Sequence, residues 1–156
     1  MFEKILVPLD GSPLAEQALP LACETAKHFN SELILMRVLV PENLVVASPT
    51  MGALYPELPV EQAEFERAEA EAYLARVRQK CEMARIASNV EVFEGAPAEM
   101  IIEAAKRTGA DLIVMSTHGR SGLSRLVYGS VAEAVLRGGR IPLLLAPIKA
   151  EPSPAG

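Results

Sequence analysis

The sequence contains no tryptophan, and its aromatic residues are few: four Phe and three Tyr among 156 residues. Aliphatic side chains must therefore fill the interior, and half of all residues are hydrophobic. This composition excludes a disordered or fibrous chain. A chain of this length is expected to fold as one domain with a sizeable core.

Long hydrophobic runs are also absent. No apolar run approaches the roughly 20 residues that a membrane-spanning helix needs. The short apolar stretch near the amino terminus is interrupted by Pro8 and Asp10, so it is too short for the hydrophobic region of a signal peptide. We therefore expect no membrane partner and a cytoplasmic location.

Cysteine is scarce. Cys23 and Cys81 lie far apart in the sequence, with no CxxC spacing and no nearby His, so they do not predict a metal site. The favoured interpretation is two buried thiols. Two unpaired thiols also suit the reducing environment of the cytoplasm.

Positive charge is in the minority. Twenty acidic and fifteen basic side chains give a net charge of −5, which disfavours a general nucleic-acid binder because phosphate backbones select basic surfaces. A local phosphate site remains compatible with this balance.

Five apolar segments alternate with longer helical patterns, which is typical of a parallel sheet built from βαβ units. The expected strands are residues 4–9, 33–40, 89–94, 111–116 and 141–146. Four of them are nearly continuous apolar runs, as expected of strands covered on both faces. The third alternates between apolar and polar residues, so we expect it at an edge.

Helical patterns fill most of the intervening sequence. Ser12 can cap a helix that begins at Pro13 and that Pro20 should kink. Residues 60–87 form the longest pattern, with a buried stripe predicted at Ala70, Leu74, Val77, Cys81 and Ala84. Further helices are expected at 97–107 and 130–137, the last ended by two glycines. The segment from Pro41 to Pro59 fits neither pattern and is typical of a lid or insertion, and residues 149–156 are expected to be a disordered tail after a domain of residues 1–148.

The segment that follows the fourth strand is rich in glycine, hydroxyl groups and arginine, and it ends at a helix start near Ser130. Ligands of parallel sheets bind beyond the carboxyl ends of the strands, and a helix amino terminus attracts anions. Arg120 and Arg125 make this segment locally positive. We therefore predict a phosphate site here, held mainly by backbone amides, because the sequence has neither a P-loop nor a GxGxxG motif.

Other interpretations of these residues stay open. Ser130 and Glu133 have the spacing of a capping box, which would satisfy the first helical amides without a ligand. The glycines could be turn residues, and His118 is more typical of a loop histidine than of a catalytic base. Asp10 could belong to a turn, or its carboxylate could accept hydrogen bonds from a ribose hydroxyl or an adenine amino group.

With these residues in view, nearly the whole chain resembles the universal stress protein family. The resemblance rests on residues 5–12, on the strand that contains Val38, on residues 110–115 and on the long loop. Nucleotide-binding members carry two glycines separated by two residues, then nine residues, then Gly-Ser or Gly-Thr. Here Gly119, residues 120–128 and Gly129-Ser130 match that spacing, while Ser116 replaces the first glycine.

The resemblance implies a single-domain α/β fold: an open five-stranded parallel sheet in the order 3-2-1-4-5 with helices on both faces, Rossmann-like and similar to the adenine nucleotide alpha hydrolases. It also implies an ATP site, with Mg²⁺ or Mn²⁺ carried on the phosphates. The adenine and ribose would be surrounded by Pro8, Leu9, Asp10 and Val38. The ribose and phosphates would be contacted by Met115, Ser116, Gly119, Arg120, Gly122, Gly129, Ser130 and Val131.

The family further implies a homodimer through the last strand, between Ile141 and Ala146, which is too apolar for an open edge. The leading hypothesis is a cytoplasmic ATP-binding stress protein that acts as a nucleotide-responsive regulatory or stress-resistance module, with at most slow ATP hydrolysis. The alternative is a dimeric interaction protein of the same fold that binds no nucleotide, which Ser116 favours. A hydrolase that uses His118 is the weakest hypothesis because no acid partner is identifiable.

Overall fold

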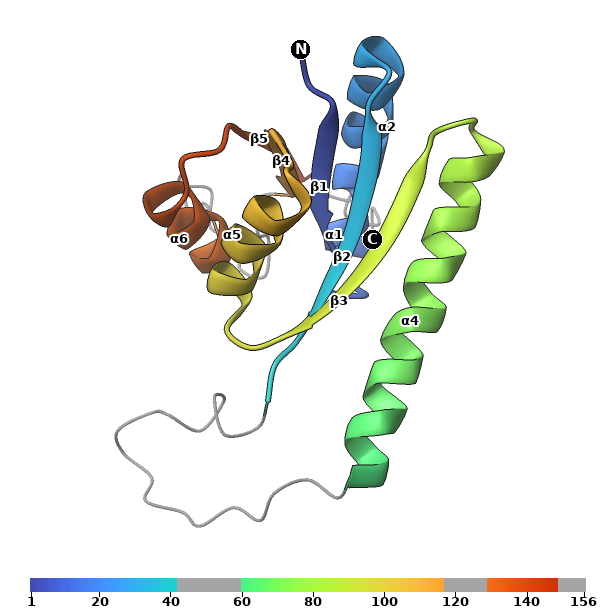
Figure 1. Ribbon diagram of the computed structural model, residues 1–156, viewed down its shortest axis with the longest axis vertical. Helices are drawn as coiled ribbons and strands as arrows, with labels where there is room; N and C mark the ends of the chain where they lie inside the picture. The colour runs from blue at the N-terminus through green and yellow to red at the C-terminus, as the bar shows by residue number, and fades with distance from the viewer. Residues whose placement is uncertain (42–59, 117–128, 149–156) are drawn as a thin grey trace, which may run out of the picture.

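Five parallel strands form one twisted sheet in the order β3-β2-β1-β4-β5 (Figure 1). The computed structural model describes residues 1–41, 60–116 and 129–148. The strands are β1 (Lys4–Pro8), β2 (Glu32–Leu39), β3 (Ser88–Glu94), β4 (Leu112–Ser116) and β5 (Leu143–Ala146). The predicted single-domain α/β fold, its strand order and the edge position of the third strand are confirmed. The last strand begins two residues later than predicted, after Pro142.

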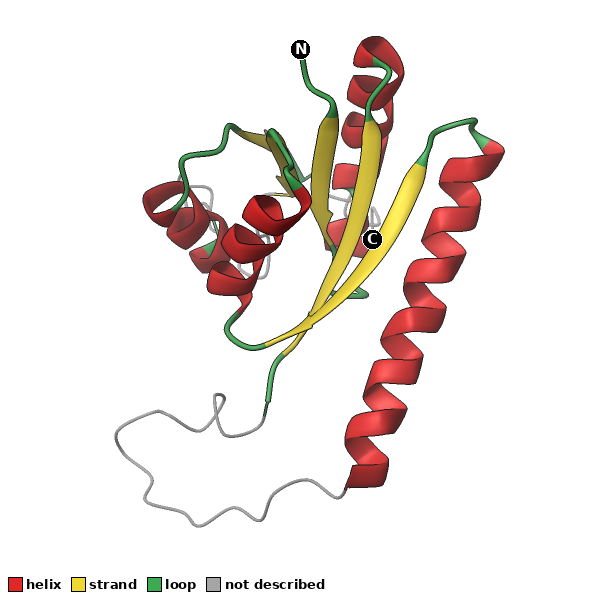
Figure 2. Ribbon diagram, in the orientation of Figure 1, coloured by secondary structure: helices red, strands yellow, loops and turns green. Residues whose placement is uncertain are grey.

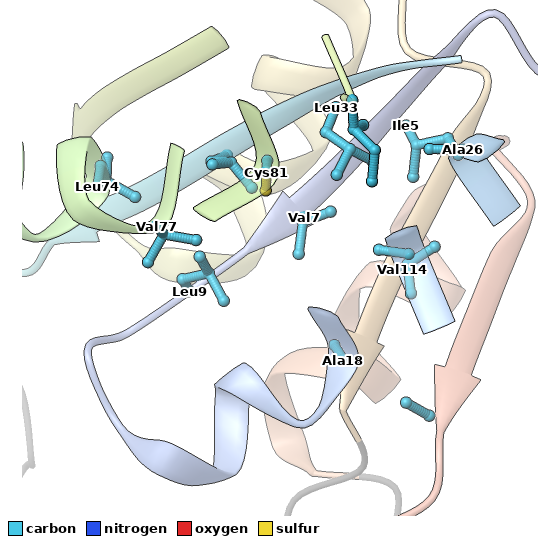
Figure 3. Close-up of a cluster of buried hydrophobic side chains, with 14 of the residues drawn as sticks. Ile5, Val7, Leu9, Ala18, Ala26, Leu33, Leu74, Val77, Cys81 and Val114 are labelled. Carbon is cyan, nitrogen blue, oxygen red and sulfur yellow. The ribbon is translucent and has the colours of Figure 1, made fainter. Parts of the chain in front are cut away.

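Helices cover both faces of the sheet (Figure 2). They are α1 (Pro13–Glu16), α2 (Ala18–Phe29), α4 (Val60–Met83), α5 (Pro97–Thr108) and α6 (Ser130–Gly138). Side chains of α2 and α4 pack on one face, around Ile5, Val7 and Leu33 (Figure 3). Side chains of α5 and α6 pack on the other face, around Leu6 and Ile34. Successive strand residues therefore enter opposite cores, which explains the continuous apolar runs.

The first helical region contains a break, as Pro20 predicts. The break lies at Gln17, between α1 and α2, so Pro20 falls in the first turn of α2. A proline ring clashes with the carbonyl group four residues earlier, and this places the distortion in the turn before the proline. Ser12 caps α1 as expected: its hydroxyl oxygen accepts a hydrogen bond from the backbone N–H of Ala15 at 3.2 Å.

The buried stripe of α4 is partly different from the prediction. Ala70, Leu74, Val77 and Cys81 are buried, but Ala84 lies beyond the end of the helix and is exposed, whereas Tyr73 is buried. A Tyr side chain buries its ring when its hydroxyl group finds a partner, and a hydrophobic pattern alone does not reveal that partner.

The amino ends of β1 and β4 are tied together by Asp111. Its carboxylate accepts hydrogen bonds from the backbone N–H groups of Glu3 and Lys4, at 2.9 and 3.2 Å. At the opposite ends of these strands, their carboxyl ends, the chain diverges. After β1 it continues to α2 on one face of the sheet, and after β4 it continues to α6 on the other face. This divergence opens a crevice between β1 and β4, the usual ligand position in such sheets. No helix of the described ranges is long and apolar enough to cross a membrane.

Candidate functional site

A cavity of about 450 Å³ lies at the carboxyl ends of β1, β2 and β4. Its volume falls within the range of small-molecule sites. The first turns of α5 and α6 and the segment after β1 complete its wall. The lining residues are Pro8, Leu9, Asp10, Ser12, Leu14, Ala15, Met36, Val38, Val40, Pro97, Ile101, Met115, Ser116, Gly129, Ser130, Val131 and Ala132.

Every predicted site residue that the structure describes lines this one cavity: Pro8, Leu9, Asp10, Val38, Met115, Ser116, Gly129, Ser130 and Val131. Gly119, Arg120 and Gly122, together with His118, lie outside the described residues. The segment from Pro41 to Pro59 lies outside them after its first residue, as does the predicted tail.

Part of the apolar lining of the cavity was not predicted from the sequence. Met36 lies two residues before Val38 on β2, so both side chains point to the same face. Strand periodicity could have found Met36. Pro97 and Ile101 come from α5, and only the packing of α5 beside β2 brings them to the cavity.

The turn after β1 holds Asp10 in a defined conformation. One carboxylate oxygen of Asp10 accepts a hydrogen bond from the backbone N–H of Ser12 at 2.8 Å, which is an Asx turn. Among the described residues, the other carboxylate oxygen has no hydrogen-bond partner. Gly11 has φ +84°, a conformation that glycine adopts without strain. The turn and the acceptor functions proposed for Asp10 therefore coexist.

A group of side chains supports this turn from the side of the sheet that α4 covers. The guanidinium group of Arg37 packs against Gly11 and lies 5.6 Å from the centre of the Tyr73 ring. The Tyr73 hydroxyl group donates a hydrogen bond of 2.8 Å to a carboxylate oxygen of Glu16 on α1. Burial, and then the hydrogen bond to Glu16, raises the pKa of Tyr73 well above its ordinary value. These contacts join β2, α4 and α1 behind Asp10.

The amino terminus of α6 does not have the predicted capping box. Gly129, not Ser130, occupies the cap position, and no side chain of the described residues caps this end. Glu133 instead forms an ion pair with Arg137 one turn later, because this i,i+4 spacing also favours a salt bridge. The first helical hydrogen bond runs from the N–H of Glu133 to the carbonyl of Gly129. The N–H groups of Ser130, Val131 and Ala132 thus have no partner within the helix, and these residues line the cavity.

The cavity therefore has chemically different regions. Met36, Val38 and Ile101 form an aliphatic wall, and no aromatic residue lines the described part of the cavity. The first turn of α6 offers backbone donors and the positive end of a helix dipole. Asp10 supplies an anionic acceptor. Within the described ranges, no cluster of His, Cys, Asp or Glu could hold a metal ion directly.

Comparison with known proteins identifies the family. The family model described as "Universal stress protein family" matches residues 1–147. The chain belongs to the universal stress protein family. This universal stress protein is 35% identical over 150 residues to universal stress protein MJ0531 of Methanocaldococcus jannaschii, a match that covers 93% of this chain and 82% of the relative.

Solved structures agree with this universal stress protein's fold. A universal stress protein from Burkholderia pseudomallei has a TM-score of 0.70 and 28% identity, covering 94% of this chain and 96% of the other. Two more distant neighbours are universal stress proteins in complex with small nucleotides. One is bound to cAMP, with TM-score 0.66, 21% identity and coverage of 95% and 98%. The other, from Archaeoglobus fulgidus, is bound to dAMP, with TM-score 0.61, 18% identity and coverage of 92% and 96%.

Proposed function

We propose that this universal stress protein binds an adenine nucleotide, ATP by preference, and acts as a nucleotide-responsive regulatory or stress-resistance module in the cytoplasm. The observation that carries the proposal is the single cavity that gathers an aliphatic wall, the Asp10 carboxylate and the uncapped first turn of α6. Related structures bound to cAMP and dAMP support the same class of ligand.

Each region of the cavity matches one part of the nucleotide. The aliphatic wall of Met36, Val38 and Ile101 can hold the adenine ring by burial of apolar surface. Asp10, fixed by its Asx turn, can accept a hydrogen bond from a ribose hydroxyl group. The backbone N–H groups at the start of α6 can donate to phosphate oxygens.

A divalent cation would bind through the phosphates, because Mg²⁺ and Mn²⁺ are commonly held by substrate phosphates together with few protein carboxylates. Such a site is better suited to binding a nucleotide than to rapid phosphoryl transfer. Phosphoryl transfer depends on positioned charges around the transferred group, and the proposed role requires only that the bound and free states differ. Slow ATP hydrolysis would be compatible with it.

The direct test begins with the protein as purified. The protein is denatured, any released nucleotide is identified by mass spectrometry, and the nucleotide-free protein is then titrated with ATP and Mg²⁺ in a calorimeter. We expect ATP to bind and to raise the melting temperature. Absence of released nucleotide, of heat and of a thermal shift would reject ATP binding and favour the interaction protein that binds no nucleotide.

A pair of isosteric variants locates the site. Asp10→Asn keeps an oxygen that can accept from Ser12 but removes the charge, and it should weaken ATP binding by about tenfold or more, since hydrogen bonds to charged groups contribute about 1.5–3 kcal/mol. Asp111→Asn is the matched control at the opposite end of the strands. It should lower stability and leave ATP affinity unchanged. Equal affinities in the two variants would remove Asp10 from the site.

We further propose that the protein is a homodimer through β5. This strand is an edge of the sheet and its Leu143, Leu144 and Leu145 side chains are only half-buried. The N–H of Ile113 donates to the carbonyl of Pro142, so the strand's alternation directs the backbone groups of Leu143 and Leu145 away from β4. A second copy could pair with these groups.

The dimer can be tested with two substitutions at one position. Leu145→Pro removes an outward N–H group, whereas Leu145→Ala shortens the side chain and keeps that N–H. Light scattering at micromolar concentration should give a dimer for the wild-type protein and for Leu145→Ala, and a monomer for Leu145→Pro. A monomeric wild-type protein would reject the proposal.

A further inference from the structure

The turn after β1 packs against the guanidinium group of Arg37. Arg37 lies between Met36 and Val38 on β2, so its side chain points away from the cavity that those two residues line. A Cβ atom added to Gly11 would lie 3.5 Å from the central carbon and from both terminal nitrogens of Arg37, which is van der Waals contact. The guanidinium group therefore supports the backbone of the turn from the side opposite the cavity.

A buried tyrosine of α4 fixes both the guanidinium group and the helix that follows the turn. The Cζ atom of Arg37 lies 5.6 Å from the centre of the Tyr73 ring, within the range of a cation–π contact. The Tyr73 hydroxyl group donates a hydrogen bond of 2.8 Å to Glu16. Glu16 belongs to α1, whose N-cap Ser12 directly follows Gly11. Tyr73 therefore holds the turn through Arg37 and holds α1 through Glu16.

The charge of Arg37 is not explained by an ion pair. In the described part of the chain, no carboxylate lies within ion-pair distance of this half-buried side chain. Burial of a charge costs free energy unless the charge is paired, so the stability of the fold does not by itself account for an arginine at this position. Its contact with the turn next to Asp10 indicates a role at the cavity.

These contacts bear on the orientation of the Asp10 carboxylate. One of its oxygens accepts a hydrogen bond from the backbone N–H of Ser12 at 2.8 Å, so the backbone of residues 11 and 12 determines where the second oxygen points. Asp10 lines the cavity and is exposed to it. Hydrogen bonds weaken steeply when their geometry departs from linearity. A shift of the turn would therefore weaken the hydrogen bond to a ligand hydroxyl group while the apolar wall of the cavity stays intact.

We propose that Arg37 and Tyr73 are positioning residues that hold the Asp10 turn so that its carboxylate accepts a hydrogen bond from one ribose hydroxyl group, and that they thereby set the preference for nucleotides that carry this hydroxyl group. The inference rests on the proposed function and names the part of the ligand that the turn recognises. Neither side chain lines the cavity, so neither is assigned a contact with the nucleotide. A site built to hydrogen-bond a hydroxyl group discriminates against an analogue that lacks it, because the acceptor is left unpaired.

The test compares three nucleotides on the full chain. Calorimetry measures the affinities for ATP, 2′-deoxy-ATP and 3′-deoxy-ATP on one preparation. We expect the wild-type protein to bind ATP about tenfold or more tightly than one of the two analogues, and that analogue identifies the hydroxyl group. In Arg37→Met, this ratio of affinities should fall by about threefold or more, a coupling of the size found between residues in contact. Partial unfolding would weaken the binding of all three nucleotides alike, so the ratio reports the position of Asp10 and not the stability of the fold.

Further variants separate positioning from a general effect. Arg107→Met is the matched control, because Arg107 also packs over an aromatic ring, 4.3 Å from the centre of Phe93, and pairs with Glu91 on β3 instead of supporting the turn. Its ratio should equal that of the wild-type protein. Tyr73→Phe keeps the ring beside Arg37 and should lower the ratio less than Arg37→Met does. Asp10→Ala removes the acceptor, so ATP and the analogue should bind equally well, and addition of Arg37→Met should change nothing more.

The two proposals fail in different ways. A wild-type protein that binds no ATP would reject the proposed function and this assignment with it. Binding of ATP and both analogues with equal affinity would leave the proposed function in place and overturn this assignment. An unchanged ratio in Arg37→Met, or an equal fall in Arg107→Met, would overturn it as well.

Discussion

The hydrogen bond between Tyr73 and Glu16 should stabilise both the fold and the turn that carries Asp10. The change to test is Tyr73→Phe, which removes one hydroxyl group and keeps the buried ring and its contact with Arg37. The lost bond, 2.8 Å long and made to a carboxylate, is of the kind that contributes about 1.5–3 kcal/mol. Glu16 is only half-buried and can be rehydrated in the variant, so we expect the lower end of this range.

A loss of about 1.5 kcal/mol corresponds to a decrease in melting temperature of about 3–6 °C for a chain of this size. Urea unfolding followed by circular dichroism measures the free energy directly. Glu16→Gln should cost less, because its amide oxygen still accepts the hydrogen bond, and Glu69→Gln on the exposed side of α4 is the control for loss of an acidic charge. The double variant of Tyr73 and Glu16 should cost less than the sum of the single variants. Additive losses would show that the two side chains do not interact.

The pH dependence gives a second check on the same contact. The pKa of Tyr73 is raised in the folded state, so the folded protein holds this proton more tightly than the unfolded chain does. The corresponding stability is fully present below the unfolded pKa of about 10 and is lost as the pH rises above it. The difference in free energy of unfolding between the wild-type protein and Tyr73→Phe should therefore decrease in alkaline solution. A stability difference that stays constant from about pH 8 to about pH 11, a range that includes the unfolded pKa of about 10, would refute the reasoning.

Four further substitutions, the last two compared with each other, test the packing of the sheet and its connections by urea unfolding. Leu74→Ala removes a fully buried side chain between α4 and the sheet and should lower the free energy of unfolding by about 2–5 kcal/mol. A loss below about 1 kcal/mol, which is roughly the contribution of one methylene group, would mean that this core is loosely packed. Asp111→Ala removes the acceptor of two backbone N–H groups of β1 and should cost about 1–3 kcal/mol. Gly139→Ala should destabilise more than Gly109→Ala, because the new methyl group would lie 2.8 Å from the Val135 carbonyl oxygen, whereas at Gly109 it meets nothing within 4 Å and only the φ of +71° opposes it. The reverse order would contradict this geometry.

The sheet was predictable from the sequence because its strands are buried on both faces. Continuous apolar runs such as residues 33–36 leave no amphipathic alternative, and the polar residues between them can only be helices or turns. The position of Asp10 at the cavity follows from the same pattern, since the carboxyl ends of parallel strands meet at one edge of the sheet.

Local patterns failed where two local interactions compete for the same residue. Glu133 has the spacing both for a capping box with Ser130 and for an ion pair with Arg137, and the structure contains the ion pair. The sequence cannot decide between them because both are worth similar, small free energies. The outcome matters for the site: since no side chain of the described residues caps α6, its first backbone N–H groups can donate hydrogen bonds to a ligand.

Contacts between elements far apart in the chain could not be predicted from the sequence. Nothing in the spacing of Cys23 and Cys81 predicts that both side chains pack in the same core cluster, because this depends on α2 and α4 lying on the same face of the sheet. The same applies to Tyr73, whose partner Glu16 comes from another helix.

The alternation of β2 connects these separate observations. Met36 and Val38 point towards α5 and α6 and line the cavity, whereas Arg37, between them, points to the opposite face, where it packs against Gly11 and Tyr73. A displacement of α4 relative to the sheet would therefore reach the Asp10 turn through Tyr73 and Arg37.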